Sequence, residues 1–176
     1  MRSFTVTRRR GALLLSLLLA VIVAVTVTIA VRGGDAAPAA ANVVKGPHFI
    51  NAETPGVLTF ENGDCFHDPA INAAMGEPRL NTTGCIGSEN EVFTFVTLRD
   101  GAWDARRVTV EGSALCEQVF RELWGRPGSG RARLDVYPVL PTQQTWVERD
   151  DRNAMCVVYS HLGTFTVDPI TEGAPE

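Results

Sequence analysis

The longest continuous apolar stretch of the chain lies near its start. Residues 12–31 carry no charged side chain, and as a helix rising about 1.5 Å per residue they would cross the roughly 30 Å hydrocarbon layer of a bilayer. Arginine occupies positions 2, 8, 9 and 10 before this run and position 32 after it. Because basic residues stay on the cytoplasmic side, the pattern predicts a cytoplasmic segment 1–11, a single transmembrane anchor 12–31 and an extracytoplasmic remainder.

A cleaved signal peptide is the alternative interpretation of this start. Its apolar core is usually only about 7 to 15 residues long and lies close to a small-residue cleavage site, which residues 37–41 could supply. The longer run and the intervening residues 32–35 favour a retained anchor. Residues 32–46 are rich in Gly, Ala and Pro without periodicity, which predicts a flexible spacer. The exported domain is then expected at 47–168 and a frayed polar tail at 169–176.

Several segments of the exported part have the composition of strands. Residues 91–98 are β-branched and aromatic on both faces, which predicts a central, well-covered strand. Residues 134–140 continue the pattern, but Pro138 places this strand at an edge of the sheet. Further strands are expected at 56–61 and in a terminal hairpin formed by 156–159 and 163–167, whereas 68–84 is expected to be a loop with at most a helical turn.

One segment has helical periodicity instead. Between Ser113 and Trp124, apolar residues recur every three to four positions, and Gly125 and Pro127 then end the pattern. This amphipathic helix carries Cys116 on its apolar side. A few strands and one helix predict an α+β domain with a mostly antiparallel sheet and one principal helix packed on it.

The four cysteines all follow the predicted anchor. An even number of cysteines in an exported domain predicts two disulfides, and sequence alone allows three pairings of Cys65, Cys85, Cys116 and Cys156. A zinc site formed by Cys65, His67 and Cys85 is the competing interpretation. Its spacing fits no common zinc motif and the compartment is oxidising, so we expect neither a metal nor another cofactor.

The net charge of the exported part limits the classes of partner that it could bind. Beyond residue 33 the chain carries all 20 acidic residues and, once the five arginines named above are set aside, 11 of the 16 basic ones. The exported part therefore has a net charge of −9, which is the wrong sign for binding nucleic acid.

No residue pattern specifies a reaction. The three histidines, His48, His67 and His161, lie in no known nucleophile motif, and Asp64 is expected to be a turn residue whose carboxylate accepts local backbone hydrogen bonds. We therefore expect no catalytic residue. The candidate functional surface comprises Asp64, His67, Glu91, Trp146, Asp151 and Arg152.

Four sequence segments carry a resemblance to a known family. They are Gly63-Asp64-Cys65-Phe66, Cys85 followed by Glu91-Val92-Phe93, Cys116 on a helix, and Pro141 and Trp146 followed by Asp151-Arg152-Asn153-Ala154-Met155-Cys156. This pattern resembles the actinobacterial septum-formation family, small membrane proteins with an exported cysteine-bearing domain. The resemblance implies in-order disulfides, Cys65 with Cys85 and Cys116 with Cys156, and a part in septum formation, but no established catalytic residue.

Two positions depart from the family pattern. The histidine usually found between the second cysteine and the Glu-Val-Phe strand is missing from residues 86–90, and Asp150 replaces the glycine before the Asp-Arg pair. The predicted function is a non-catalytic interaction module, anchored in the cell membrane and presenting its exported surface to division or cell-wall assembly proteins. The alternative is an envelope enzyme or ligand sensor with a pocket near His67, formed with Asp64 and the charged turn 148–152.

Overall fold

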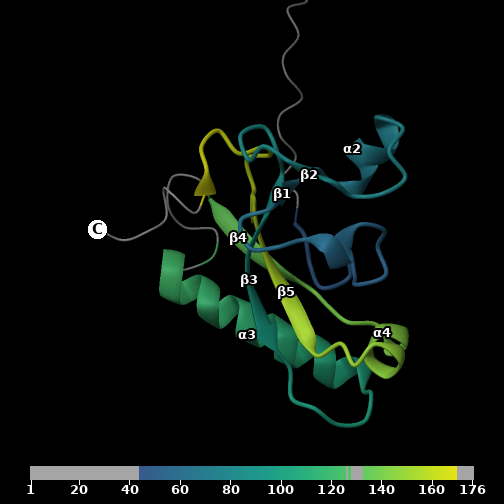
Figure 1. Ribbon diagram of the computed structural model, residues 1–176. Coiled ribbons are helices and arrows are strands. Elements are labelled where there is room, and N and C mark those ends of the chain that lie inside the picture. Colours follow the sequence, from purple (N-terminus) through teal and green to yellow (C-terminus); the bar gives the residue numbers. More distant parts are fainter. Residues whose placement is uncertain (1–43, 126, 128–132, 170–176) are drawn as a thin grey trace, which may run out of the picture. The chain divides into compact units, whose positions relative to one another are not determined.

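The computed structural model describes residues 44–125, 127 and 133–169 (Figure 1). The predicted cytoplasmic segment 1–11, the anchor 12–31, most of the spacer and nearly all of the tail lie outside these residues. Within them the predicted α+β fold is confirmed: one antiparallel sheet, one long helix and two disulfides.

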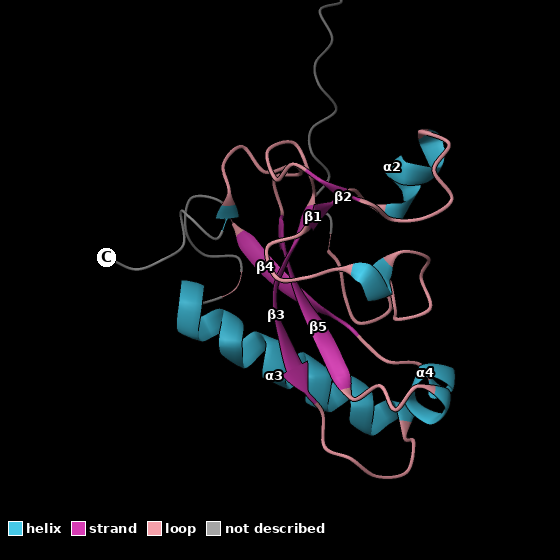
Figure 2. Ribbon diagram, viewed as in Figure 1, coloured by secondary structure: helices cyan, strands magenta, loops and turns pink. Residues whose placement is uncertain are grey.

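Five strands form the sheet in the order β2-β1-β3-β5-β4, with every neighbouring pair antiparallel (Figure 2). Two long strands, β3 and β5, pair in its centre, and β4 is an edge strand, as Pro138 predicts. The bounds are β1 Cys65–Phe66, β2 Thr82–Thr83, β3 Asn90–Thr97, β4 Leu134–Val139 and β5 Asn153–Ser160.

Helix α3, Ala105–Trp124, crosses one face of the sheet and packs on β3, β4 and β5 (Figure 1). It begins eight residues before the predicted start at Ser113, where the Asp104 side chain caps it by accepting a hydrogen bond from the Arg107 backbone at 3.0 Å. The sequence pattern does not reveal the first two turns of α3, because Val108 and Gly112 are the only buried residues in them. The predicted end is confirmed at Gly125.

Two predicted strands are wrong. Residues 56–61 contain a 3₁₀ helix, η1 Val57–Thr59, because Gly56 adopts a φ of 98° and its carbonyl accepts the Thr59 N–H at 3.1 Å. The second arm of the terminal hairpin, 163–167, is also not a strand. The backbone of Phe165 bonds instead to Gly87 and Ser88, each at 2.8 Å, which brings its ring into the core.

Two short helices complete the described elements: α2 Pro69–Ala74, which is the helical turn expected within 68–84, and α4 Gln143–Glu148. Thr142 and Thr145 form a capping box at the start of α4.

Both disulfides have the in-order pairing that the family resemblance implies. Cys65 bonds to Cys85 across 20 residues, and Cys116 bonds to Cys156 across 40. The second bridge joins the buried side of α3 to the central strand β5.

Side chains alternate between two layers of core along the strands. One layer, containing Phe93, Val158 and the Cys116–Cys156 bridge, lies under α3. The other, containing Val92, Tyr137 and Tyr159, lies on the opposite face. This second face is covered by the N-terminal segment through Ile50, Val57 and Phe60. Part of the predicted spacer belongs to this cover, because Lys45 is buried at 6 % exposure. The predicted domain start at residue 47 is therefore too late.

Candidate functional site

Lys45, the only lysine in the chain, lies at the centre of a buried polar cluster. Its side chain is 2 % exposed and forms an ion pair with Asp68, while Nζ also donates a hydrogen bond to Asn90 Oδ1 at 2.7 Å. Its backbone N–H donates to the hydroxyl of Tyr159 at 3.1 Å. A buried ammonium group needs such partners because an unpaired one would be strongly disfavoured.

Asn90, the first residue of β3, connects the remaining members of the cluster. Its Nδ2 donates to Asp68 Oδ1 at 2.8 Å and to the carbonyl of Phe66 at 3.2 Å. Its Oδ1 accepts a second hydrogen bond from the Tyr137 hydroxyl at 2.9 Å. We call Lys45, Asp68, Asn90, Tyr137 and Tyr159 the lysine cluster.

Aromatic rings surround the Lys45 side chain. The Lys45 Nζ lies 4.9 Å from the ring centre of Phe49 and 5.3 Å from that of Tyr159. Tyr137 contacts both rings edge to face, with centroids 5.4 Å from Phe49 and 5.8 Å from Tyr159. The cation is therefore held by ring faces and by the side chains of Asp68 and Asn90.

Burial changes the acid–base properties of the cluster. It lowers the pKa of Lys45, although the hydrogen bond and charge of Asp68 and the charge of Glu89 partly oppose this effect. Burial raises the pKa of the Tyr137 hydroxyl well above its usual 10, and the charge of Asp68 raises it further. Tyr137 therefore keeps its proton at neutral pH and acts as a hydrogen-bond donor.

His67 lies next to the lysine cluster but pairs with a residue that the sequence analysis does not single out. Its Nδ1 is 3.0 Å from Glu89 Oε2, and the same oxygen accepts the Asp68 backbone N–H at 3.2 Å. The side chains of His67 and Glu89 are 26 % and 11 % exposed. The pair connects the end of β1 to the segment before β3.

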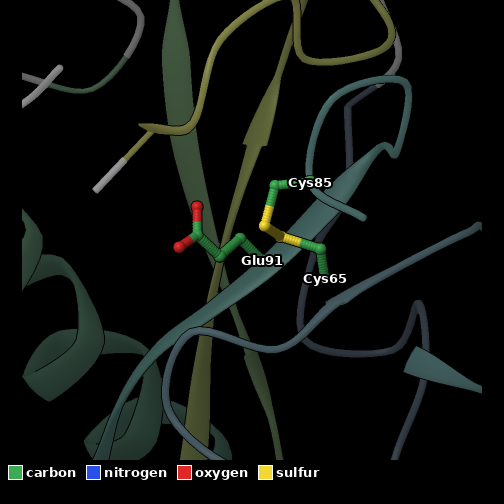
Figure 3. Close-up of side chains that lie close together, drawn as sticks. All are labelled: Cys65, Cys85 and Glu91. Atoms are coloured by element: carbon green, nitrogen blue, oxygen red, sulfur yellow. A yellow bond between two sulfur atoms is a disulfide. The ribbon is translucent and has the colours of Figure 1, made fainter. Parts of the chain in front are cut away.

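Figure 3 shows the Glu91 side chain next to the Cys65–Cys85 bridge, with its carboxylate directed away from the two sulfurs. The carboxylate and the two sulfurs lie within 4.8 Å of one another, the spacing of metal ligands. The sulfurs are bonded to each other, so neither is the thiolate that zinc requires. The zinc alternative with His67 therefore does not fit the oxidised domain.

The six residues of the predicted functional surface do not form one surface. Glu91 and Trp146 are buried, at 1 % and 2 % exposure, and so are wrongly assigned to it. Asp64 accepts the Glu61 N–H at 2.7 Å, which confirms its role in a turn. The Asp151 carboxylate likewise accepts the Asn153 N–H at 3.2 Å.

Arg152 is also a structural residue. Its guanidinium lies 3.9 Å from the centre of the Trp146 ring and forms ion pairs with Asp100 at 2.7 Å and Asp150 at 3.0 Å. The Trp146 indole N–H donates to the Gly101 carbonyl at 3.0 Å. Together these contacts attach α4 to the loop that follows β3.

A groove of about 310 Å³ lies between the η1 loop, Arg79 and α4. Within the described ranges, the guanidinium groups of Arg79 and Arg149 have no acidic partner at ion-pair distance. Glu53 is the one acidic side chain in the lining. The lining comprises Ala52, Glu53, Thr54, Pro55, Gly56, Leu58, Thr59, Arg79, Gln144, Thr145 and Arg149.

Gly56 holds the two sides of this groove together. A Cβ at this position would lie 2.0 Å from the carbonyl oxygen of Leu80, so only glycine lets the η1 loop approach the segment that carries Arg79. The Leu80 N–H completes the junction by donating to the Pro55 carbonyl at 2.8 Å.

Comparisons with known proteins add no further assignment. No protein-family model, curated protein or solved structure matches the chain, so the septum-formation resemblance stays a prediction. Among residues 44–125, 127 and 133–169, none of the helices has both the length and the apolar character needed to cross a bilayer.

Proposed function

We propose that the protein is a non-catalytic binding module, anchored in the cell membrane by residues 12–31 and acting outside the cytoplasm in septum formation. The charge-free apolar run and its flanking arginines support the anchor. Two disulfides and no free cysteine support an oxidising compartment.

The groove beside α4 is the observation that most directly supports a binding function. Two arginines without acidic partners are concentrated there, although the exported part as a whole is acidic. Guanidinium groups bind carboxylates through paired hydrogen bonds. The groove therefore suits an acidic segment of a division or cell-wall assembly protein.

The composition of the groove supports a non-catalytic role. No histidine or cysteine lines the groove. His67 is paired with Glu89, and His161 with Asp135, at 3.0 Å each. The alternative of an enzyme or ligand sensor near His67 stays a prediction, supported only by the His67–Glu89 pair.

Imaging tests the proposal in dividing cells of the native host. The full-length protein carries a C-terminal fluorescent protein that matures outside the cytoplasm. We compare the wild type with the double variant Arg79→Ala/Arg149→Ala. The control is Arg106→Ala, which removes an exposed arginine of α3. We expect septal enrichment of the wild type and the control. The double variant should keep its protein level but spread over the whole envelope.

Two outcomes would contradict the proposal in different ways. A uniform envelope signal for the wild type would contradict the role in septum formation. Septal enrichment that is equal in the wild type and the double variant would contradict the groove as the binding site.

A further inference from the structure

The geometry points to an intramolecular isopeptide bond between Lys45 and Asn90, formed with release of ammonia and assisted by Asp68. The lysine cluster places an amine, a carboxamide and a carboxylate in mutual hydrogen-bond contact inside the fold. These are the three groups that such an amide exchange requires. The inference does not depend on the proposed function.

Lys45 supplies the nucleophile. An ammonium group has no free electron pair and becomes reactive only after losing a proton. Burial lowers the pKa of Lys45 and so makes the neutral amine easier to reach. Nζ already contacts Oδ1 of the Asn90 carboxamide at 2.7 Å, which places it beside the carbon that it would attack.

Asn90 supplies the electrophile, and Tyr137 stabilises the charge that develops on it. When an amine adds to Cγ, negative charge collects on Oδ1, which accepts the Tyr137 hydroxyl at 2.9 Å. A donor already aimed at this oxygen has the role of an oxyanion hole. Its raised pKa keeps the Tyr137 proton in place during the reaction.

Asp68 carries the protons. It pairs with Lys45 Nζ and accepts from Asn90 Nδ2 at 2.8 Å, so a single carboxylate contacts both the attacking and the leaving nitrogen. Asp68 takes one proton from the ammonium before the attack and a second from the same nitrogen afterwards. Both pass to Nδ2, the Cγ–Nδ2 bond breaks and ammonium leaves.

The reaction is balanced without another reagent. Lys45 loses two protons and forms one C–N bond, Asn90 loses its amide nitrogen, and Asp68 returns to the carboxylate form. Nothing is oxidised or reduced. Chain mass falls by one ammonia, about 17 Da.

Asn90 is a better acceptor than Asp68 itself. A carboxylate resists attack because it is already negative, and the Asp68 side chain is 18 % exposed to water. Asn90 is 0 % exposed, and its carbonyl oxygen accepts the Tyr137 hydroxyl and the lysine together. An amide formed there would be shielded from hydrolysis.

The bond would join the start of the domain to its central sheet. Residue 45 precedes η1, β1, α2 and β2 in the chain, whereas Asn90 begins β3. The cross-link would enclose residues 45–90 in a covalent ring that also contains the Cys65–Cys85 bridge. Tension applied from the N-terminal side would then pass directly to β3.

Tryptic digestion of the full-length protein, purified, reduced and alkylated, tests the inference. Lys45 is the only lysine, so a free side chain allows trypsin to release peptides 46–79 and 80–99 separately. We expect instead one branched species, in which peptide 80–99 is joined to peptide 33–79, which stays uncut at Lys45. Its mass should be about 17 Da lower than the sum of the two peptides. Fragmentation should place the link at Lys45 and Asn90.

Variants identify the role of each group. Lys45→Arg and Asp68→Asn should give unlinked peptides, whereas Asp64→Asn, the same exchange at a turn residue outside the cluster, should link fully. Tyr137→Phe should link about 100-fold more slowly after synthesis, as expected for loss of one oxyanion donor. Circular dichroism of each variant separates loss of the reaction from loss of folding.

The wild-type digest alone can overturn the inference. Complete cleavage after Lys45, with peptides of unmodified mass, would mean that the lysine cluster is only an ion-pair network. A loss of about 18 Da with a link to Asp68 would show that water leaves instead, and would contradict the assignment to Asn90.

Discussion

Lys45 shows how much of this domain depends on single side chains. The chain uses arginine at 15 of its 16 basic positions, and its one lysine is buried among aromatic rings. Arginine could not replace it in the proposed reaction, because its guanidinium stays protonated and is a poor nucleophile. Both tyrosines of the chain, Tyr137 and Tyr159, are members of the same cluster.

The tyrosines predict a loss of stability in alkali. Burial raises the pKa of both hydroxyls above 10 in the folded state, whereas the unfolded chain ionises near pH 10. The unfolded state therefore releases more protons, and stability that is complete below about pH 10 is lost as the pH rises toward the folded values.

Urea unfolding between about pH 8 and pH 11 measures this effect. The midpoint for the wild type should fall above about pH 10, and the fall should be shallower in Tyr137→Phe because one raised pKa is gone. Phenolate absorbance should appear together with unfolding. Ionisation of both tyrosines in the folded protein at about pH 10 would contradict their burial as the cause.

Among the secondary-structure elements, helix α3 is held on the sheet by close packing and by a disulfide. Its position on the sheet depends on close contact at Gly112, where a Cβ would lie 2.4 Å from a Leu140 methyl group. The Cys116–Cys156 bridge and the Phe120 side chain continue the same buried stripe. The helix is therefore attached to β5 by a covalent bond within a packed layer.

Removal of this bridge should weaken the whole domain. We expect Cys116→Ala/Cys156→Ala to lower the free energy of unfolding by about 2 to 5 kcal/mol, because the unfolded chain gains freedom across a long loop. The matched double variant Cys65→Ala/Cys85→Ala opens a loop half as long and should lose less. Chemical denaturation under non-reducing conditions measures both, and a larger loss for the second pair would contradict loop entropy as the cause.

At the scale of the whole molecule, the lysine cluster closes the domain near its N-terminal side. Residue 45, the last but one of the predicted spacer 32–46, is already part of the fold. The Cys116–Cys156 bridge attaches α3 to β5, and the proposed isopeptide would attach the segment around Lys45 to β3. Such a domain would suit the membrane-anchored binding role proposed above.

We expect the proposed anchor, residues 12–31, to stay attached to the mature protein. The full-length protein with an N-terminal tag should remain in the membrane fraction after an alkaline carbonate wash, with tag and domain on one chain, because a 20-residue apolar helix inserts stably. A version with arginines introduced at Leu17 and Val23 should be extracted. Loss of the tag with release of the domain would instead support the cleaved signal peptide.

Local patterns in the sequence determined several features of the described fold. The strands β3 and β4, the edge position of Pro138, the end of α3 at Gly125 and the buried side of Cys116 follow from residue types within one segment. The same patterns do not predict the start of α3 at Ala105, because the buried stripe of its first two turns consists only of Val108 and Gly112. The disulfide pairing was available only through the family resemblance.

The tertiary structure alone decided the lysine cluster and the groove. Lys45, Asp68, Asn90 and Tyr137 come from four separate segments. Antiparallel pairing of β3, β5 and β4 brings Asn90 close to Tyr137, and pairing of β1 with β3 places Asp68, which follows β1, beside Asn90. A lone lysine in a Gly- and Ala-rich stretch resembles a spacer residue until its burial is known. Periodicity reports which face of an element is buried, but it does not report which distant side chains meet there.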